Sequence, residues 1–233
     1  MITKRINMFK LYRLTDLIIN LCRWPAAILL LLSIPILLQT YGYFNYATFK
    51  FYSFFGGIAL FVATVIFAGT ESRQSLQIVA HELTHSFFAL LTLHSVHHIR
   101  LNPDGTGGSM QLMGGNWLII LAPYFFPLFA FFYMLIMPYI YSLVESVWIL
   151  HGILGYLTAY YWATVISQIH PQQTDIIRSG YIFSAIIILA MNLYMTGCIF
   201  AYNNNLWHGL TLYHKTLYKL GLKDLHYILN LIA

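Results

Sequence analysis

Residues 76–93 read LQIVAHELTHSFFALLTL, an apolar stretch that contains His81, Glu82 and His85. On an α-helix, residues four apart lie on one face about a turn apart, so the two imidazoles could bind one metal ion together. Glu82 directly follows the first histidine and could reach a metal-bound water as general base, which is the arrangement of the HExxH zinc signature. The stretch therefore predicts a helix that carries a metal site.

The composition of the whole chain places that helix in a membrane. Of the 233 residues, 59% are hydrophobic and 8% are charged, whereas soluble domains carry about 25% charged residues. So few charges cannot cover the surface of a water-soluble protein. This excludes a soluble enzyme, a disordered chain and a DNA-binding domain, despite a pI near 9.1. Ionisable side chains in hydrocarbon are costly and functional by default, which makes the HExxH residues the first candidate site.

Apolar windows of about 20 residues, the length that a helix needs to cross a bilayer, predict an all-α fold with six transmembrane helices. We expect one integral membrane domain over residues 1–233, with a catalytic core at 74–178. Residues 1–23 alternate basic and apolar side chains and predict an interfacial amphipathic helix, and residues 203–233 predict a similar cytoplasmic tail. The six predicted spans are 25–43, 52–68, 74–95, 117–139, 143–166 and 180–202.

The basic residues predict the orientation, because cytoplasmic loops carry an excess of Lys and Arg. Six spans put both termini on one side. With that side cytoplasmic, nine basic residues lie inside and three outside. We therefore expect a membrane protein with both termini in the cytoplasm and no nucleic-acid partner. The inner group is Lys4, Arg5, Lys10, Arg13, Arg23, Arg73, Lys215, Lys219 and Lys223, and the outer group is Lys50, Arg100 and Arg178.

The segment 96–115, VHHIRLNPDGTGGSMQLMGG, is rich in glycine and has a Pro-Asp-Gly turn signal at 103–105. Short extended runs at 96–101 and 109–113 flank the turn. This pattern is typical of a β-hairpin, and a plain polar loop is the alternative. We expect a short glycine-rich hairpin or loop after the HExxH helix.

A catalytic zinc usually binds three protein ligands and a water, so the two histidines need a third partner. Asp175 is favoured, because Zn²⁺ with two neutral histidines, one aspartate and one glutamate sums to zero charge, the least costly total in a low-dielectric site. His170 and His151 are the alternates. His151 matches the predicted depth of His81, whereas Asp175 lies towards the opposite end of the six-span arrangement, unless the Pro171 segment dips into the membrane.

The stretch 80–108, AHELTHSFFALLTLHSVHHIRLNPDGTGG, resembles the small bacterial B-like branch of the site-2-protease-type zinc metallopeptidases. Residues 173–175, Gln-Thr-Asp, are similar to the downstream motif that supplies the third ligand in that family, although the Leu-Asp-Gly form is absent. The resemblance covers residues 75–185 and implies that the protein lies in a bacterial cytoplasmic (inner) membrane. It implies hydrolysis of peptide bonds within the membrane, with one Zn²⁺ per chain, Glu82 as general base, and a membrane protein or peptide as substrate.

A transmembrane substrate helix hides its carbonyls in its own hydrogen bonds, so such hydrolysis needs a locally unwound segment. The strand edge of the hairpin, near Gly107 and Gly108, could hold that segment. Asn116 could donate a hydrogen bond to the substrate or oxyanion, and a helix N-cap is its alternative role. Pro123 and Pro127 would loosen the fourth span near the site.

Two other functions fit parts of the pattern. HELTH is also an HxxxH and residues 94–98, HSVHH, form an HxxHH, as in the membrane desaturases and hydroxylases that hold two irons. Those enzymes need a third histidine box, and none follows. The second alternative is a non-enzymatic transporter or scaffold with a buried metal or proton site. The oligomeric state is left open.

Overall fold

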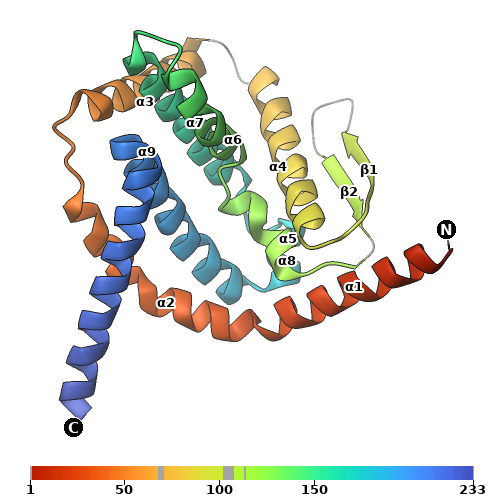
Figure 1. Cartoon of the computed structure of the whole chain (residues 1–233). Coiled ribbons are helices and arrows are strands. Elements are labelled where there is room, and N and C mark those ends of the chain that lie inside the picture. The colour runs from red at the N-terminus through yellow and green to blue at the C-terminus, as the bar shows by residue number, and fades with distance from the viewer. Residues whose placement is uncertain (1, 68–70, 102–107, 113, 233) are drawn as a thin grey trace.

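The computed structural model describes residues 2–67, 71–101, 108–112 and 114–232 as a bundle of helices with one two-stranded hairpin (Figure 1). The predicted class, a helical membrane bundle, is confirmed. The elements are α1 (Ile2–Leu21), α2 (Arg23–Thr40), η1 (Tyr41–Tyr43), α3 (Phe49–Phe67), α4 (Glu71–Leu91), β1 (Val96–Leu101), β2 (Gly108–Leu112), α5 (Trp117–Leu121), η2 (Ala122–Tyr124), α6 (Leu128–Tyr141), α7 (Val147–Gln168), α8 (Thr174–Ser179) and α9 (Tyr181–Ile232).

Four of the described helices are long and apolar enough to cross a membrane, namely α2 with η1, α3, α7 and α9. A fifth candidate span is the bent pair formed by α5 with η2 and by α6. The HExxH helix α4 lies where the third span was predicted, but it is not among these candidates. Its residues Gln77, His81 and Glu82 are polar and buried inside the protein. The protein is therefore an integral membrane protein whose site helix is more polar than its candidate membrane-spanning helices.

The fourth predicted span is broken. Trp117–Tyr124 and Leu128–Tyr141 meet at an angle of 78°. Pro123 lies in the first turn of η2, and Pro127 directly precedes α6. Each proline lacks an N–H and cannot continue a helical hydrogen-bond ladder, so the two together account for the bend.

Side chains from other helices bind carbonyl groups at this break. The amide of Asn192, on α9, donates to the carbonyl oxygen of Tyr124 over 2.8 Å. The hydroxyl of Tyr161, on α7, donates to the carbonyl oxygen of Phe125 over 2.9 Å. A buried carbonyl without a partner costs free energy comparable to a lost hydrogen bond, so α7 and α9 stabilise the bend.

The hairpin after α4 is antiparallel, with Ile99 opposite Met110 and Leu101 opposite Gly108. Its register is irregular between Val96 and His98. The predicted Pro-Asp-Gly turn at 103–105 and Gly107 lie outside the described residues.

The long helix α9 reverses direction within its length. Asn205 and Leu206 have non-helical backbone angles, and Leu206 has a positive φ of 46°. The hydroxyl of Tyr194 lies 2.8 Å from Nε2 of His214, although a straight helix would separate these residues by about 30 Å. The segment predicted as a cytoplasmic tail is thus helical and folds back along the first half of α9 (Figure 1).

The six-span arrangement puts α2 and α9 in opposite directions, and the structure shows this to be wrong. The guanidinium of Arg23, at the start of α2, donates to the carbonyl oxygen of Ser179, just before α9. At the other end of α2, the Tyr41 hydroxyl donates to the carbonyl oxygen of Leu193 over 2.6 Å. The two helices are therefore parallel, and Arg23 and Arg178, predicted on opposite sides, lie at one end of the molecule. The predicted directions were wrong because the prediction treated each apolar window as one crossing of the membrane.

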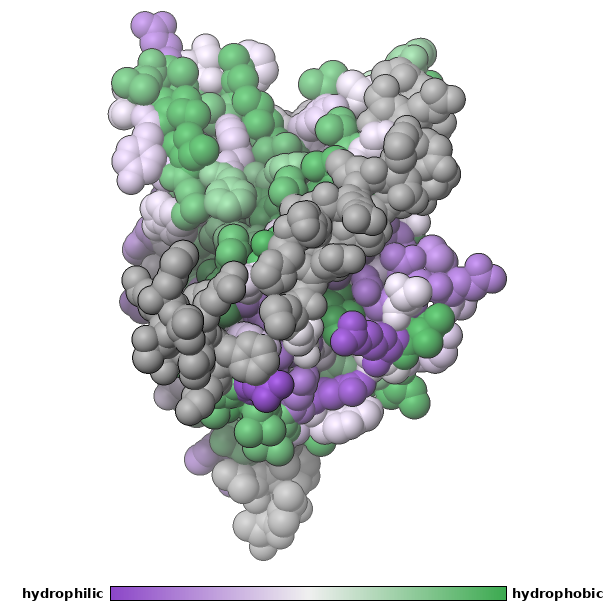
Figure 2. All heavy atoms as spheres, turned by 90° about the vertical axis from the view of Figure 1, so that its right-hand side faces the viewer, coloured by the Kyte–Doolittle hydropathy of each residue, from purple (hydrophilic) through white to green (hydrophobic). Residues whose placement is uncertain are grey.

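Hydrophobic and hydrophilic residues are separated on the surface of the molecule. Figure 2 shows one face, on which hydrophobic residues dominate the upper part and hydrophilic residues gather in the lower half, at the height of α1 and α8 in Figure 1. The hydrophilic residues of this face thus lie at the height of α8, which ends at Ser179, the residue that Arg23 contacts.

Candidate metal centre

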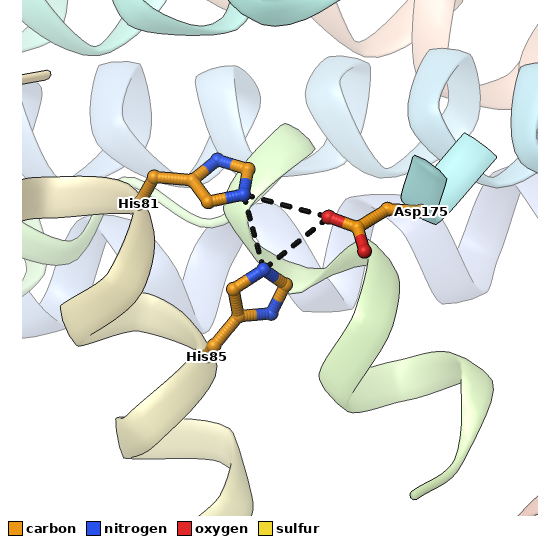
Figure 3. Close-up of side chains that lie close together, drawn as sticks. All are labelled: His81, His85 and Asp175. Carbon is orange, nitrogen blue, oxygen red and sulfur yellow. Dashed lines mark hydrogen bonds and ion pairs between the residues drawn. The ribbon is translucent and has the colours of Figure 1, made fainter. Parts of the chain in front are cut away.

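Three side chains from two helices meet in the described part of the chain. His81 and His85 project from one face of α4, and Asp175 projects towards them from α8 (Figure 3). The two Nε2 atoms are 3.0 Å apart, and Oδ2 of Asp175 lies 3.5 Å from that of His81 and 3.4 Å from that of His85. The predicted pair and the favoured third residue therefore come together.

Hydrogen bonds on the far side of each ring set the orientation of both imidazoles. Nδ1 of His85 lies 2.8 Å from the carbonyl oxygen of Ile119, which can only accept. Nδ1 of His81 lies 2.5 Å from Oε1 of Gln168, whose own Nε2 donates to the carbonyl oxygen of Gln77 over 3.1 Å. In neutral rings both Nδ1 atoms therefore carry the hydrogen, and both Nε2 lone pairs point into the triangle. Such outer hydrogen bonds are typical of metal-binding histidines.

The triangle fits a divalent cation. A tetrahedral zinc ion with ligands at its usual distances would hold the ligand atoms about 3.3 Å apart, close to the three separations observed. Two imidazole lone pairs 3.0 Å apart repel each other unless a cation or a proton lies between them. Two imidazoles and one carboxylate are a donor set that catalytic zinc sites use, in which a water takes the fourth position.

Asp175 was expected at a different depth from His81, but the structure places the two side by side. The chain leaves α7 at Gln168, turns through residues 169–173, and places Asp175 in the first turn of α8. Burial alone would raise the pKa of the Asp175 carboxyl, but the neighbouring imidazoles of His81 and His85 outweigh burial and hold that pKa well below its usual range. Asp175 is therefore an anion, as a metal ligand must be.

Tyr124 completes the wall of the site. Its hydroxyl donates to Oδ2 of Asp175 over 3.2 Å, and its ring packs edge-on against His81 with centroids 5.2 Å apart. Tyr124 lies in η2 at the break of the fourth span, so the bend brings a hydrogen-bond donor to the ligand carboxylate.

Glu82, the predicted general base, is 6% exposed and lies beside this group. Its carboxyl interacts electrostatically with His85, His81 and Asp175. It follows His81 on the same helix, close to the centre without belonging to the triangle of ligand atoms.

The two alternate ligands lie elsewhere. His170 is exposed in the connection before α8. His151 is buried and its Nδ1 lies 2.8 Å from Oδ1 of Asn203. It precedes Gln168 by seventeen residues on the same helix, or roughly 25 Å at 1.5 Å per residue, and Gln168 is the residue that touches His81.

Among the predicted substrate-binding residues, Asn116 has the alternative role. Its side chain accepts from the backbone N–H of Ile119 over 3.1 Å and caps α5, while its amide nitrogen donates to Asp16 over 2.8 Å. Asn116 is 1% exposed, so its amide is engaged within the protein. Gly108 begins β2, and Gly107 falls outside the described residues.

Sequence reasoning missed Gln168, Tyr124 and Asp16. Gln168 was within reach of prediction, because it is a polar residue at the end of an otherwise apolar helix. Tyr124 lies between Pro123 and Pro127. The two prolines indicated a break in the helix, but they did not indicate that the break places the Tyr124 hydroxyl beside Asp175. Asp16 lies far from the motif in sequence, and nothing in the pattern connects them.

Comparison with known proteins agrees with the site. A model of the Peptidase M50B-like family matches residues 55–170, about half of the chain. The matched region includes α4 with its HExxH residues and ends before Asp175. No curated protein and no solved structure matches the chain. The chain therefore belongs to the Peptidase M50B-like family, which is of the site-2-protease type.

Proposed function

We propose that this membrane peptidase is a zinc metallopeptidase that cleaves peptide bonds of membrane-embedded proteins or peptides. The observation that carries the proposal is the triangle of His81, His85 and Asp175, with both imidazole Nε2 atoms turned inward by hydrogen bonds to Gln168 and Ile119. One Zn²⁺ held there would supply a Lewis acid that polarises the scissile carbonyl and acidifies water.

The side chains of the site have separate roles in this reaction. Glu82 accepts a proton from the attacking water and passes it to the leaving amine. Gln168 and the carbonyl of Ile119 keep the imidazoles in the ligating tautomer and orientation. The Tyr124 hydroxyl holds the Asp175 carboxylate in place. The paired strands β1 and β2 offer an edge to which an unwound substrate segment could add.

Metal analysis with a cleavage assay tests the proposal. The purified protein is expected to contain one zinc per chain and to cleave some of a set of labelled single-span peptides reconstituted with it in liposomes. Removing the zinc with a chelator should stop cleavage, and adding zinc back should restore it. Two irons per chain would favour the desaturase alternative, and a protein that binds zinc but cleaves no peptide would favour the transporter or scaffold.

We further propose that the protein lies in a bacterial cytoplasmic membrane with both termini in the cytoplasm. The excess of basic residues near the termini supports this orientation. The return of α9 after Leu206 supports a C-terminus on the side where α9 begins. The parallel arrangement of α2 and α9 then puts Arg178 on the cytoplasmic side as well.

Thiol labelling in whole cells checks this sidedness. The exposed Cys22 in a Cys198→Ser background, and Arg178→Cys in a background without both native cysteines, are expected to react alike. Both should resist an impermeant maleimide in intact cells and react once the membrane is opened. Labelling of the two positions from opposite sides would contradict the contact between Arg23 and Ser179 and restore the six-span arrangement.

A further inference from the structure

The carboxylate of Asp16, on α1, contacts residues at both ends of the segment that contains β1 and β2. It accepts hydrogen bonds from the backbone N–H of Gly115 over 3.0 Å and from the amide nitrogen of Asn116 over 2.8 Å, and Nε2 of His94 lies 3.1 Å away. The side chain of His94 is fully buried, and that of Asp16 is 15% exposed. One charged group of α1 thus binds the residues just before β1 and just after β2.

Neighbouring contacts fix α1 in this position. The Thr15 hydroxyl lies 3.0 Å from the carbonyl oxygen of Thr92, at the end of α4. Gly114 has a φ of +90°, and a Cβ there would lie 2.8 Å from Oδ2 of Asp16. Glycine at this position therefore leaves room for the carboxylate.

A short chain of hydrogen bonds leads from Asp16 to a metal ligand. Asp16 holds the Asn116 side chain, and Oδ1 of Asn116 accepts from the N–H of Ile119 in the first turn of α5. The carbonyl oxygen of Ile119 then accepts from Nδ1 of His85. Asp16 thereby fixes the turn of backbone that orients the His85 ring.

Arg23 acts in the same way on the other side of the site. Its guanidinium donates to the carbonyl oxygen of Ser179, at the end of α8, and lies 4.3 Å from the ring centre of Phe183. Asp175 lies four residues before Ser179 on that short helix. Arg23 therefore holds the helix that delivers the third ligand.

We propose that Asp16 and Arg23 are positioning residues that set the metal affinity of the centre. They belong to one segment, residues 15–23, which we name the N-terminal clasp. Asp16 contacts the start of α5 and Arg23 contacts the end of α8. The placement of His85 depends on α5, and that of Asp175 depends on α8. The clasp lies outside the region matched by the family model. This inference rests on the proposed function, because it takes the triangle to be a metal site.

Exchange of the carboxylate and the amide between positions 16 and 116 tests the clasp. Asn116→Asp keeps an N-cap for α5, because aspartate caps as well as asparagine, but it places two carboxylates against each other. We expect the zinc dissociation constant, measured by chelator competition, to rise about tenfold or more, the usual effect of losing an outer partner. The double variant Asp16→Asn with Asn116→Asp rebuilds the amide–carboxylate hydrogen bond and should recover most of the affinity.

Arg23 supplies an independent arm of the test. Arg23→Met keeps an unbranched side chain but removes the hydrogen-bond donor to Ser179. This variant should bind zinc about tenfold more weakly. Arg23→Lys keeps a cation that can donate to the same carbonyl and should weaken it less. Asp224→Asn and Lys219→Met, which change charge in the second half of α9, are the matched controls and should bind zinc as the wild type does.

The outcomes separate the clasp from the proposed function, because zinc titration needs no substrate. If the wild type binds no zinc, both fail together. If the wild type binds zinc and the Asn116→Asp and Arg23→Met variants bind it equally well, the clasp alone is refuted. A loss in Asn116→Asp that the double variant does not recover would likewise refute it, since the two residues would then not act as a pair.

Discussion

Replacing Glu82 by glutamine is expected to lower kcat by about 10²–10⁴-fold, the usual contribution of a general base, while the protein keeps one zinc per chain. Glutamine has nearly the shape of glutamate but cannot accept the proton of the attacking water. Glu82 lies beside the triangle of ligand atoms and is not part of it. Initial rates of cleavage in liposomes and metal analysis of the same preparation measure the two effects.

Glu145→Gln is the matched control, because Glu145 is exposed in the connection between α6 and α7. It should cleave at the wild-type rate. Full activity of Glu82→Gln would remove the proposed general base, and loss of zinc from that variant would make Glu82 a ligand instead.

Replacing Asp175 by alanine should release the zinc. Two imidazoles would remain, and the loss of the single anionic ligand would leave the dication and Glu82 with a net positive charge in a low-dielectric site. Loss of an outer partner costs about 10–100-fold in metal affinity, so loss of this ligand should cost more, and cleavage should fall with it. Chelator competition at fixed pH measures the affinity.

His170→Ala and His151→Ala are the informative controls. His170 is exposed, and His151 lies along α7 far from the triangle, bonded to Asn203. Both variants should retain one zinc per chain. Zinc retained by Asp175→Ala but lost from either histidine variant would show that the third ligand has been assigned to the wrong residue.

The ligands of the site could be predicted from sequence because their chemistry is local or rare. His81 and His85 share a helix face by spacing alone, and the chain has few acidic residues from which to choose Asp175. The groups that orient these ligands could not be predicted. The carbonyl of Ile119 has no side-chain signal, and Gln168 becomes meaningful only once α7 ends beside α4.

The helices could be placed from hydropathy, but their directions could not. A sliding window treats each apolar stretch as one crossing, and three features of this chain depart from that rule. The site helix α4 is not apolar enough to count among the candidate spans, the fourth predicted span bends by 78°, and α9 reverses at Asn205 and Leu206. The reversal has neither glycine nor proline at its two non-helical residues, and its local signal, the three asparagines 203–205, lies between two helical stretches.

The broken fourth span also restricts how relatives of this protein can diverge. Pro123 and Pro127 create the bend, and Tyr161 and Asn192 bind the carbonyl groups there. A homologue that straightened this helix would remove the carbonyl partners of Tyr161 and Asn192 at the break, leaving only the bond between these two side chains and the bond from Asn192 to the carbonyl oxygen of Ile188. Each lost hydrogen bond would cost about 0.5–1.5 kcal/mol. We therefore expect these four positions to co-vary, so that homologues without the prolines also carry apolar residues in place of the tyrosine and asparagine.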